Sequence, residues 1–243
     1  MFAIQNIQIV GCAVATEDHP RWDDGDPHYG IGGAIGLTPG GSRVVNGDFV
    51  NIGGYGFWWS STDTSQTLAS GRGSIYSLSS FPLYGSDKYY GFSVRAMRDA
   101  TTLEKAYHDG EIIKDDYEDG DGNKYDGVKI GEQVWTTENL KTTKYQDTSA
   151  IDHITGNAAW EAATDGAYCW YDNDIGWKNI YGALYNWFAV NSGLVGGSWR
   201  VPSDADWTQL TDYIVREFGY MGFEAANVAV FLKSCRQVNH PKA

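Results

Sequence analysis

The clearest pattern of apolar and polar positions lies in residues 203–218. Apolar side chains recur there at helical spacing and fall on one face: Trp207, Leu210, Ile214 and Phe218. Ser203 is followed three residues later by Asp206, the arrangement of a capping box, and Gly219 provides a stop. These signals predict an amphipathic helix whose apolar face is buried.

Alternating patterns predict β-structure elsewhere. Apolar residues alternate in two short runs within 117–140, which indicates a β-hairpin that turns near Gly131. In the first hundred residues, pairs of glycines separate short β-like runs such as Ser42–Val45 and Gly56–Ser60, so we expect sheet and loop there. Shorter helices are predicted over 157–163, 181–190 and 222–233. The second of these carries Leu184, Trp187 and Phe188 toward a core.

Residues 100–116 interrupt these patterns. The segment is polar and has little apolar periodicity, so it is a candidate linker between residues 1–99 and 117–243. With 243 residues and 42% apolar content, the chain can bury one large core or two small ones. Length alone does not choose between them.

Composition narrows the class of protein. The chain has 30 Gly, 10 Trp and 16 Tyr, which is typical of short strands joined by many turns. Its formal charge of −13 argues against nucleic acid as a partner, because phosphate binding needs clustered Lys and Arg. We interpret the acidity as favouring solubility rather than cation binding. No apolar run approaches the ~20 residues of a membrane span, and the first residues lack the pattern of a secretory signal.

Three cysteines, Cys12, Cys169 and Cys235, are too few for a disulfide scaffold and too widely spaced for a zinc site. One pair with one residue left over is the natural expectation. Cys169 lies between aromatic residues, which favours a small packed side chain over a nucleophile. The histidines form no spaced metal motif and no obvious Ser/His/Asp set.

Acidic strings raise the possibility of calcium. The string around Asp119 lacks the Gly and Glu of an EF-hand loop, so an Asx-rich turn is the better interpretation. The string at Asp23 is another candidate. Asp172 and Asp174 are the better metal-ligand candidates, since they follow an aromatic strand and precede a loop, but a solvated turn is the favoured interpretation even there.

Residues 62–90 carry the most useful functional signal. The segment holds seven Ser, four Tyr and three Gly in 29 positions, the residue types that are enriched in antibody paratopes. It is framed by GFWWS at 56–60 and GFSVR at 91–95, which we expect to be buried strand ends. A loop of this composition on a rigid scaffold indicates a recognition surface. An ordinary Ser-rich surface loop is the alternative.

Several strings together resemble the Fibrobacter succinogenes major paralogous domain family. The strings are 121–145, 167–174, 181–193, 199–210, 37–62 and 91–99, and they cover most of the chain. The resemblance implies an α+β, C-type-lectin-like fold with short twisted antiparallel strands, two or more helices and much irregular loop. The family is related to formylglycine-generating, sulfatase-modifying proteins.

The order of these strings departs from the family. The closing half occupies 1–99 and the opening half 117–243, so the resemblance implies a circularly permuted order. The halves can form one domain joined by 100–116, because a 17-residue connector reaches ~55 Å at ~3.3 Å per residue. Alternatively, the chain is a slice of a tandem array whose halves are completed by neighbouring copies. We favour one domain, in which Cys12 and Cys235 flank the cut and are disulfide candidates.

The resemblance also bears on function. The enzyme relatives need paired cysteines near the end of the fold, and residues 56–99 contain none, so we expect no catalysis and no cofactor apart from the calcium candidate. Similar folds are targets of diversity-generating retroelements, which vary the stretch before the GFSVR-like strand. Under that reading Trp58, Trp59, Phe92 and Val94 are scaffold. The expected ligand-binding positions are Thr64, Gln66, Ser70, Arg72, Tyr76, Tyr84 and Tyr89.

The sequence therefore predicts a noncatalytic module that binds a protein or glycan ligand. By resemblance, it belongs to a bacterial surface protein, lipoprotein-like or phage-associated, and is extracellular. A structural or self-assembling repeat module, which exchanges halves between copies, is the alternative.

Overall fold

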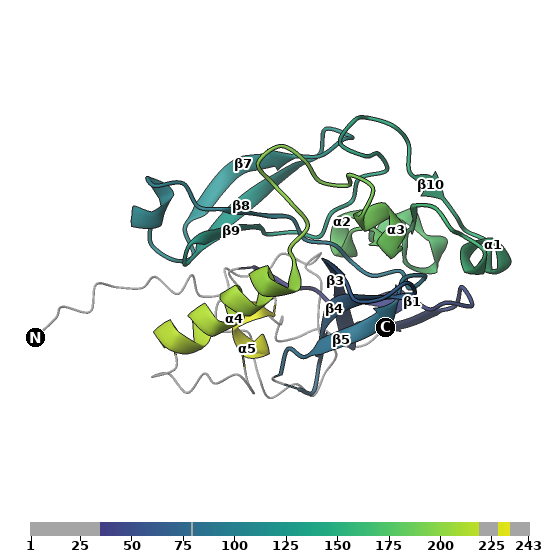
Figure 1. Ribbon diagram of the computed structural model, residues 1–243, viewed down its shortest axis with the longest axis horizontal. Helices are drawn as coiled ribbons and strands as arrows, with labels where there is room; N and C mark the ends of the chain where they lie inside the picture. Colours follow the sequence, from purple (N-terminus) through teal and green to yellow (C-terminus); the bar gives the residue numbers. More distant parts are fainter. Residues whose placement is uncertain (1–34, 79, 219–227, 234–243) are drawn as a thin grey trace, which may run out of the picture.

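Three small sheets contain the strands of the protein in the computed structural model, which describes residues 35–78, 80–218 and 228–233 (Figure 1). Short helices and 3-10 turns connect the strands, so the protein has the mixed α+β character that the sequence predicts. The helices lie outside the sheets and are mostly a single turn long; α4 is the long exception.

The first sheet has five strands in the order β2-β1-β3-β4-β5. Its strands are β1 (Gly40–Arg43), β2 (Phe49–Ile52), β3 (Tyr55–Asp63), β4 (Leu68–Ile75) and β5 (Leu83–Asp87). Strands β1 and β3 pair in parallel and the remaining neighbours are antiparallel. The predicted runs Ser42–Val45 and Gly56–Ser60 overlap β1 and β3.

The second sheet has four strands in the order β6-β9-β8-β7. Its strands are β6 (Met97–Asp99), β7 (Ile112–Glu118), β8 (Lys124–Ile130) and β9 (Gln133–Thr136). The predicted hairpin is confirmed, because β8 and β9 are joined at Gly131, whose φ of +59° suits glycine. Strand β6, from the first part of the chain, completes the sheet by pairing with β9.

The connector 100–116 is more ordered than its polar composition indicated. It contains the 3-10 helix η1 (Glu104–Ala106) and the first residues of β7, which pairs with β8 at the edge of the second sheet. An edge strand exposes much of its surface to solvent, so it needs few apolar residues. For this reason its pattern did not indicate a strand.

The third sheet is small, with the order β10-β11-β12, and short helices surround it. Its strands are β10 (Asp152–His153), β11 (Ala167–Cys169) and β12 (Leu184–Tyr185). The helical turns are α1 (Asn157–Glu161), η2 (Tyr171–Asn173), η3 (Ile175–Trp177), α2 (Lys178–Tyr181) and α3 (Trp187–Val190). The predicted helix over 157–163 is confirmed as α1, although it is shorter.

The predicted helix over 181–190 is mostly wrong. Leu184 and Tyr185 pair with β11 as a strand, and the helical residues are Tyr181, the last residue of α2, and those of α3. The side chain of Asn186 accepts a hydrogen bond from the N–H of Ala189 and so starts α3 after the strand. Leu184 and Trp187 are buried as expected, whereas Phe188 is only partly buried.

Helix α4 (Asp204–Phe218) is the element that the sequence predicted best. The N–H of Asp206 donates to Ser203 Oγ (3.1 Å), and the N–H of Ser203 donates back to Asp206 Oδ2 (2.8 Å), which is the expected capping box. Trp207, Leu210 and Ile214 are buried on one face. Helix α5 (Ala229–Leu232) falls inside the predicted 222–233. Residues 219–227, including the predicted stop at Gly219, lie outside the described residues.

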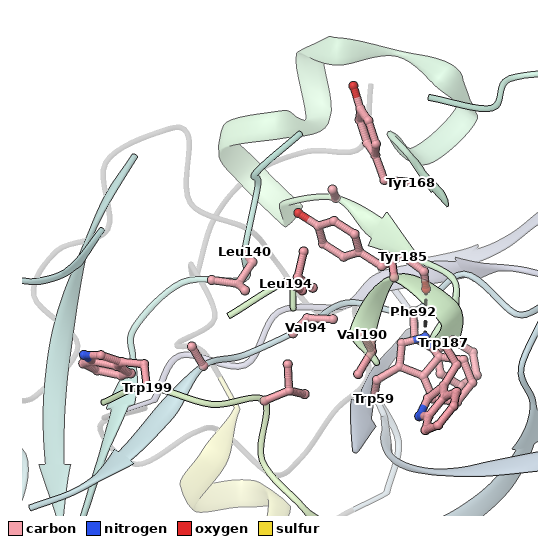
Figure 2. Close-up of a cluster of buried hydrophobic side chains, with 14 of the residues drawn as sticks. Trp59, Phe92, Val94, Leu140, Tyr168, Tyr185, Trp187, Val190, Leu194 and Trp199 are labelled. Carbon is pink, nitrogen blue, oxygen red and sulfur yellow. Dashed lines mark hydrogen bonds between the residues drawn. The ribbon is translucent and has the colours of Figure 1, made fainter. Parts of the chain in front are cut away.

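The adjacent residues Trp58 and Trp59 point to opposite faces of β3, and both are fully buried. Trp59 belongs to a cluster with Phe92 and Trp187, and its Nε1 donates to the Tyr185 carbonyl (2.8 Å) (Figure 2). Trp58 belongs to a second cluster, in which α4 covers the sheet. The first sheet is therefore covered on both faces at β3.

Residues from both parts of the chain share these clusters. Ring centroids of Phe81 and Trp207 are 5.4 Å apart, and those of Trp135 and Trp207 are 4.4 Å apart. The backbone of Phe92 pairs with that of Tyr185. The described residues of segments 35–99 and 117–233 thus contribute side chains to the same interior.

Candidate ligand-binding surface

Residues 62–90 form the end of β3, the whole of β4 and β5, and the turns between them. The sequence indicated a loop here, but the structure has a sheet: β4 and β5 pair without interruption from Leu68 opposite Asp87 to Arg72 opposite Leu83. Gly is a weak strand former, and the strands depend on pairing with each other and with β3, most of which lies outside the segment. The predicted binding positions are therefore spread over two faces and two ends of a sheet.

Thr64, Gln66 and Tyr89 lie at one end of this sheet. Thr64 and Gln66 are exposed in the β3–β4 turn, and the N–H of Lys88 donates to the Thr67 carbonyl in that turn (3.0 Å). Lys88 Nζ also donates to the Ser65 carbonyl (2.8 Å). Tyr89, which follows Lys88, is consequently beside the turn and is partly exposed.

Ser70 and Arg72 make contacts inside the protein. Ser70 is buried on β4. The Arg72 guanidinium pairs with Asp204 Oδ1 at 2.6 Å and also donates to Thr208 Oγ1 at 2.9 Å. Both partners are on α4, so this arginine ties β4 to the helix.

Tyr76 lies at the opposite end of β4 from Thr64. Strand β4 runs from Leu68 to Ile75, which corresponds to about 23 Å at ~3.3 Å per residue. The Tyr76 ring packs against the cluster that contains Trp58. The structure therefore does not bring Tyr76 together with Thr64 and Gln66.

Tyr84 belongs to a group of partly exposed rings on one face of the first sheet. We call this group the aromatic surface; its members are Tyr55, Phe57, Tyr84 and Tyr90. Phe57 stacks on Tyr55 with centroids 6.0 Å apart, and Tyr84 meets Phe57 edge-on at 5.9 Å. Such offset and edge-on contacts between rings are favourable geometries.

Buried rings hold the aromatic surface from below. Phe92 stacks with Phe57 at 5.0 Å and contacts Tyr90 at 5.4 Å. Beneath them, Phe92 meets Trp59 at 4.5 Å, and Figure 2 shows these two side chains with Trp187. The predicted scaffold residues are all buried: Trp58, Trp59, Phe92 and Val94.

A glycine on β4 makes room for the exposed rings. A Cβ atom at Gly73 would lie 2.7 Å from Tyr84 Cε2 and 3.0 Å from the Phe57 ring. Real Cβ atoms do not approach so closely, so a larger residue would push both rings out of place. The aromatic surface thus requires a glycine at position 73 of β4.

The chemistry of the aromatic surface is apolar with hydrogen-bonding tips. Burial raises the pKa of Tyr84, and the nearby Tyr55 raises it further, so the hydroxyl is protonated at neutral pH. It can both donate and accept a hydrogen bond. The rings of such a surface can stack against a planar or apolar group of a ligand. The tyrosine hydroxyls can form hydrogen bonds with polar atoms at the edge of that group.

Sequence reasoning missed Tyr55, Phe57 and Tyr90 as surface residues. A signal for the first two was present: aromatic residues alternate at 55, 57 and 59, and glycines alternate at 71 and 73 in the next strand. Bulky residues opposite glycines on paired strands indicate one face carrying rings. Tyr90 has no comparable local signal. It joins the other rings only through its contact with Phe92, which the sequence pattern does not reveal.

The structure places Asp172 and Asp174 in exposed turns. Asp172 has a left-handed φ of 51°, and Asp174 Oδ1 accepts a hydrogen bond from the N–H of Gly176 (2.8 Å). Within 35–78, 80–218 and 228–233, no group of three His, Cys, Asp or Glu side chains is arranged to hold a metal ion. The calcium ligands remain a prediction.

The string around Asp119 forms the expected Asx-rich turn. Asp119 Oδ1 accepts from the N–H groups of Asp121 and Asn123, both at 3.0 Å. Asp119 Oδ2 accepts from the Tyr125 hydroxyl at 2.6 Å. The protein's own donors thus satisfy this carboxylate.

Cys169 is buried, and its burial raises the pKa of the thiol to about 12. At neutral pH the group is a thiol rather than a thiolate, which fits the predicted packing role. The disulfide candidates Cys12 and Cys235 lie outside the described residues. Across the described helices, none has the length and apolar character that a bilayer span requires.

Comparison with known proteins finds a family match over part of the chain. Residues 128–237 match the model of the Fibrobacter succinogenes major domain. The match runs from within β8 past α5 and supports the family expected from the sequence for the second part of the chain. No curated protein and no solved structure matches the chain.

Proposed function

We propose that this protein is a noncatalytic module that binds a protein or glycan ligand through the aromatic surface and the neighbouring β3–β4 turn. One observation carries the proposal: Tyr55, Phe57, Tyr84 and Tyr90 are partly exposed, yet each is in ring contact with Phe57 or Phe92. Exposed apolar residues are ordinarily scattered singly, and contiguous exposed patches mark interaction sites.

Fixed rings favour binding because little conformational entropy is lost when a ligand arrives. An immobilised side chain costs about 0.5–1.5 kcal/mol on binding, and the stack on Phe92 has already limited these side chains. Tyrosine also supplies a large contact area with a polar tip. Thr64 and Gln66 add adaptable polar contacts at the end of the sheet.

We propose that the role is binding rather than catalysis. Cys169 is the one cysteine in the described part of the chain, and its raised pKa argues against a thiolate nucleophile. Arg72, a predicted ligand contact, is engaged by Asp204. The aromatic surface supplies shape and hydrogen bonds, which are the requirements of recognition.

For the architecture, we propose a C-type-lectin-like fold with the family's halves in permuted order, forming one domain. The pairing of β6 with β9 and the shared clusters support closure within one chain. We further propose an extracellular or cell-surface location, as part of a bacterial or phage-associated protein with a diversified 62–90 segment. This location and diversification rest on the family resemblance.

A self-assembling structural module is the second candidate. The exposed side chain of Leu83 on the outermost strand of the first sheet favours it, because exposed apolar edges promote association. The formal charge of −13 opposes it, since copies of the chain repel one another. We therefore place it behind ligand binding.

The test is a paired substitution, Tyr84→Ala with Tyr90→Ala, probed on a glycan array and on a displayed random-peptide library. We expect ligands selected by the unchanged protein to bind the variant about tenfold or more weakly, as removal of contact aromatics commonly does. Arg72 is left unchanged because its ion pair supports the fold.

Tyr107→Ala is the matched control, because Tyr107 is another partly exposed tyrosine but lies in the connector. It should leave binding unchanged. Equal binding by the Tyr84/Tyr90 variant, or no ligand in either collection, would contradict the proposal. A thermal unfolding curve of each variant separates lost binding from lost folding.

A further inference from the structure

Strand β5 is an outer strand of the first sheet, and half of its backbone groups face away from β4. The N–H of Gly73 donates to the Pro82 carbonyl and that of Lys88 to the Thr67 carbonyl, which sets the alternation of the ladder. The backbone N–H and C=O groups of Tyr84 and Ser86 therefore hydrogen-bond with β4. Leu83, Gly85 and Asp87 direct their backbone groups outward.

These outward groups are unpaired in the described part of the chain, except that the Asp87 carbonyl accepts from Tyr90 N–H (3.0 Å). Unpaired N–H and C=O groups in a row form a template for another strand. Leu83 and Gly85 each present both groups, separated by one residue. This spacing matches the hydrogen-bonding period of an added antiparallel strand.

The other outer strands of the first and second sheets carry features that block pairing, and β5 lacks them. Asn51 interrupts β2 with a φ of 69°, and Asp115 interrupts β7 with a φ of 52° beside a register shift. Strand β6 is three residues long, and its Met97 already pairs with Arg200. Within the described residues, β5 is regular over Leu83–Asp87. Natural proteins interrupt sheet edges to prevent association, so a regular edge indicates use.

Space and apolar area are available beside β5. A Cβ atom at Gly85 would have nothing within 4 Å. Leu83 is 49% exposed, and Leu68, near the opposite end of the β4–β5 pair, is 40% exposed. An added strand beside β5 could bury Leu83, whereas Leu68 is on β4, on the other side of β5.

The charged side chains near β5 indicate which charge a partner should carry. The side chain of Asp63 is 55% exposed while its partner Lys88 is 7% exposed. Asp204 is 28% exposed while its partner Arg72 is 11% exposed. Carboxylates therefore face the solvent and their cations do not, which favours a partner rich in Lys or Arg. The same charges disfavour a second copy of this acidic chain.

We propose that β5 binds an extended segment of a partner polypeptide as a sixth strand, with apolar and basic residues alternating along the segment. This inference rests on the proposed function and assigns its ligand to the polypeptide class. Backbone hydrogen bonds to Leu83 and Gly85 supply affinity, and alternate side chains supply specificity. Tyr84, on the same strand, connects this edge to the aromatic surface.

The test compares two substitutions at one position. Gly85→Pro removes the outward N–H and places a ring at the edge, while no inward hydrogen bond is lost. Gly85→Ala keeps the N–H and meets no atoms. The probe is a heptapeptide of alternating lysine and valine, with alternating glutamate and valine as the charge-reversed probe, titrated into the isotope-labelled full chain by NMR.

We expect the lysine–valine peptide to bind the unchanged chain and Gly85→Ala alike, and Gly85→Pro about tenfold or more weakly, which corresponds to one lost hydrogen bond. The glutamate–valine peptide should bind more weakly than the lysine–valine peptide. Bound peptide should slow hydrogen exchange at the amides of Leu83, Gly85 and Asp87. Those of Tyr84 and Ser86 should be slow already.

A second measurement needs no protein variant. The backbone nitrogens of the lysine–valine peptide can be methylated either at its lysines or at its valines. Each choice removes the N–H donors on one edge of the extended peptide. Only the set that faces β5 should abolish binding when it is methylated. Equal loss with both methylated peptides, or no binding of the unmethylated peptide, overturns the inference. Concentration-dependent dimerisation that Gly85→Pro abolishes also overturns it, because a second copy would then occupy β5.

The two proposals fail differently. If selected glycans lose binding in the Tyr84/Tyr90 variant but no peptide depends on Gly85, the aromatic surface stands and the β5 inference is wrong. If the peptide depends on Gly85 but not on Tyr84 or Tyr90, the β5 edge stands and the aromatic surface is wrong.

Discussion

Arg95 shows how a single residue organises several segments. It is fully buried, and its guanidinium donates to the carbonyls of Ile35 (2.9 Å), Gly36 (2.6 Å) and Thr136 (2.7 Å), and to Asn139 Oδ1 (2.7 Å). None of these partners is a carboxylate, and burial lowers the pKa of Arg95 to about 9. The planar fork of donors thus ties three carbonyls and one side-chain amide from separate segments to one side chain.

We predict that Arg95→Met destabilises the protein by about 3–5 kcal/mol, because it leaves several buried acceptors unpaired. Urea unfolding monitored by tryptophan fluorescence measures the change. Arg216→Met is the control, since that side chain is 69% exposed and its loss should cost less than about 0.5 kcal/mol. A similar small loss for Arg95→Met would mean that water replaces the guanidinium.

Two glycines in neighbouring strands should respond oppositely to alanine. Gly73→Ala inserts a methyl group against Tyr84 and Phe57 and should cost about 1–3 kcal/mol. Gly85→Ala meets open space and should be neutral or stabilising by up to about 1 kcal/mol, because alanine loses less backbone entropy on folding. Thermal unfolding of the pair measures both. Equal effects would contradict the packing described for the aromatic surface.

At the scale of elements, an ion-pair network ties the connector 100–116 to strand β6. Arg98 of β6 pairs with Glu104 of η1 and Asp116 of β7, each at 2.6 Å. The hydrogen bond from Arg98 holds the pKa of Glu104 to about 2, below its ordinary value of 4.5. The polar connector is ordered because charged partners, rather than apolar contacts, hold it.

This network predicts a pH dependence. Because the folded state lowers the pKa of Glu104, its contribution to stability is complete above about pH 4.5 and is lost as the pH falls to about 2. Glu104→Gln should therefore cost about 2 kcal/mol at pH 7, and the difference from the unchanged protein should shrink between pH 4.5 and 2. Urea unfolding across this range measures it.

Glu132→Gln is the control for the network, because Glu132 pairs with Lys105 in an exposed position, where ion pairs contribute little. It should change stability slightly at every pH. A constant deficit for Glu104→Gln down to pH 2 would show that its role does not depend on charge.

Elements with local signals were predicted correctly. Helix α4 has both partners of its capping box within four residues, and the β8–β9 hairpin has its glycine at the turn. The predicted 181–190 helix was mostly wrong, because β11 pairs with Leu184 and Tyr185. The binding segment was read as a loop for the same reason, since its strands depend on each other and on β3.

At the scale of the whole molecule, the two parts of the chain meet through Phe92. Its ring touches Phe57 and Trp59, and its backbone pairs with Tyr185 from the second part. Phe92→Ala should cost about 3–5 kcal/mol. Because Phe92 joins the two parts, we expect β4 and β12 to lose hydrogen-exchange protection together.

The measurement is hydrogen exchange by mass spectrometry with a denaturant series on the unchanged protein and Phe92→Ala. One coincident transition for segments 35–99 and 117–233 is expected of a shared interior. Two separate transitions would indicate that the parts fold independently. Ala substitution of Leu103, which is 69% exposed in the connector, should leave both segments unaffected.

The sequence alone determined the features that depend on neighbours along the chain. These are the capped helix, the hairpin at Gly131 and the Asx turn at Asp119. Periodicity and capping act over a few residues, so the pattern of side chains records them directly.

Only the tertiary structure decided which surfaces remain available. It assigned Arg72 to Asp204, 132 positions away, gathered Tyr55, Phe57, Tyr84 and Tyr90 over Phe92, and left β5 at an open edge. Contacts of this kind join residues that are distant in sequence, and burial on one sheet face depends on what the rest of the chain places there. No local pattern encodes that choice.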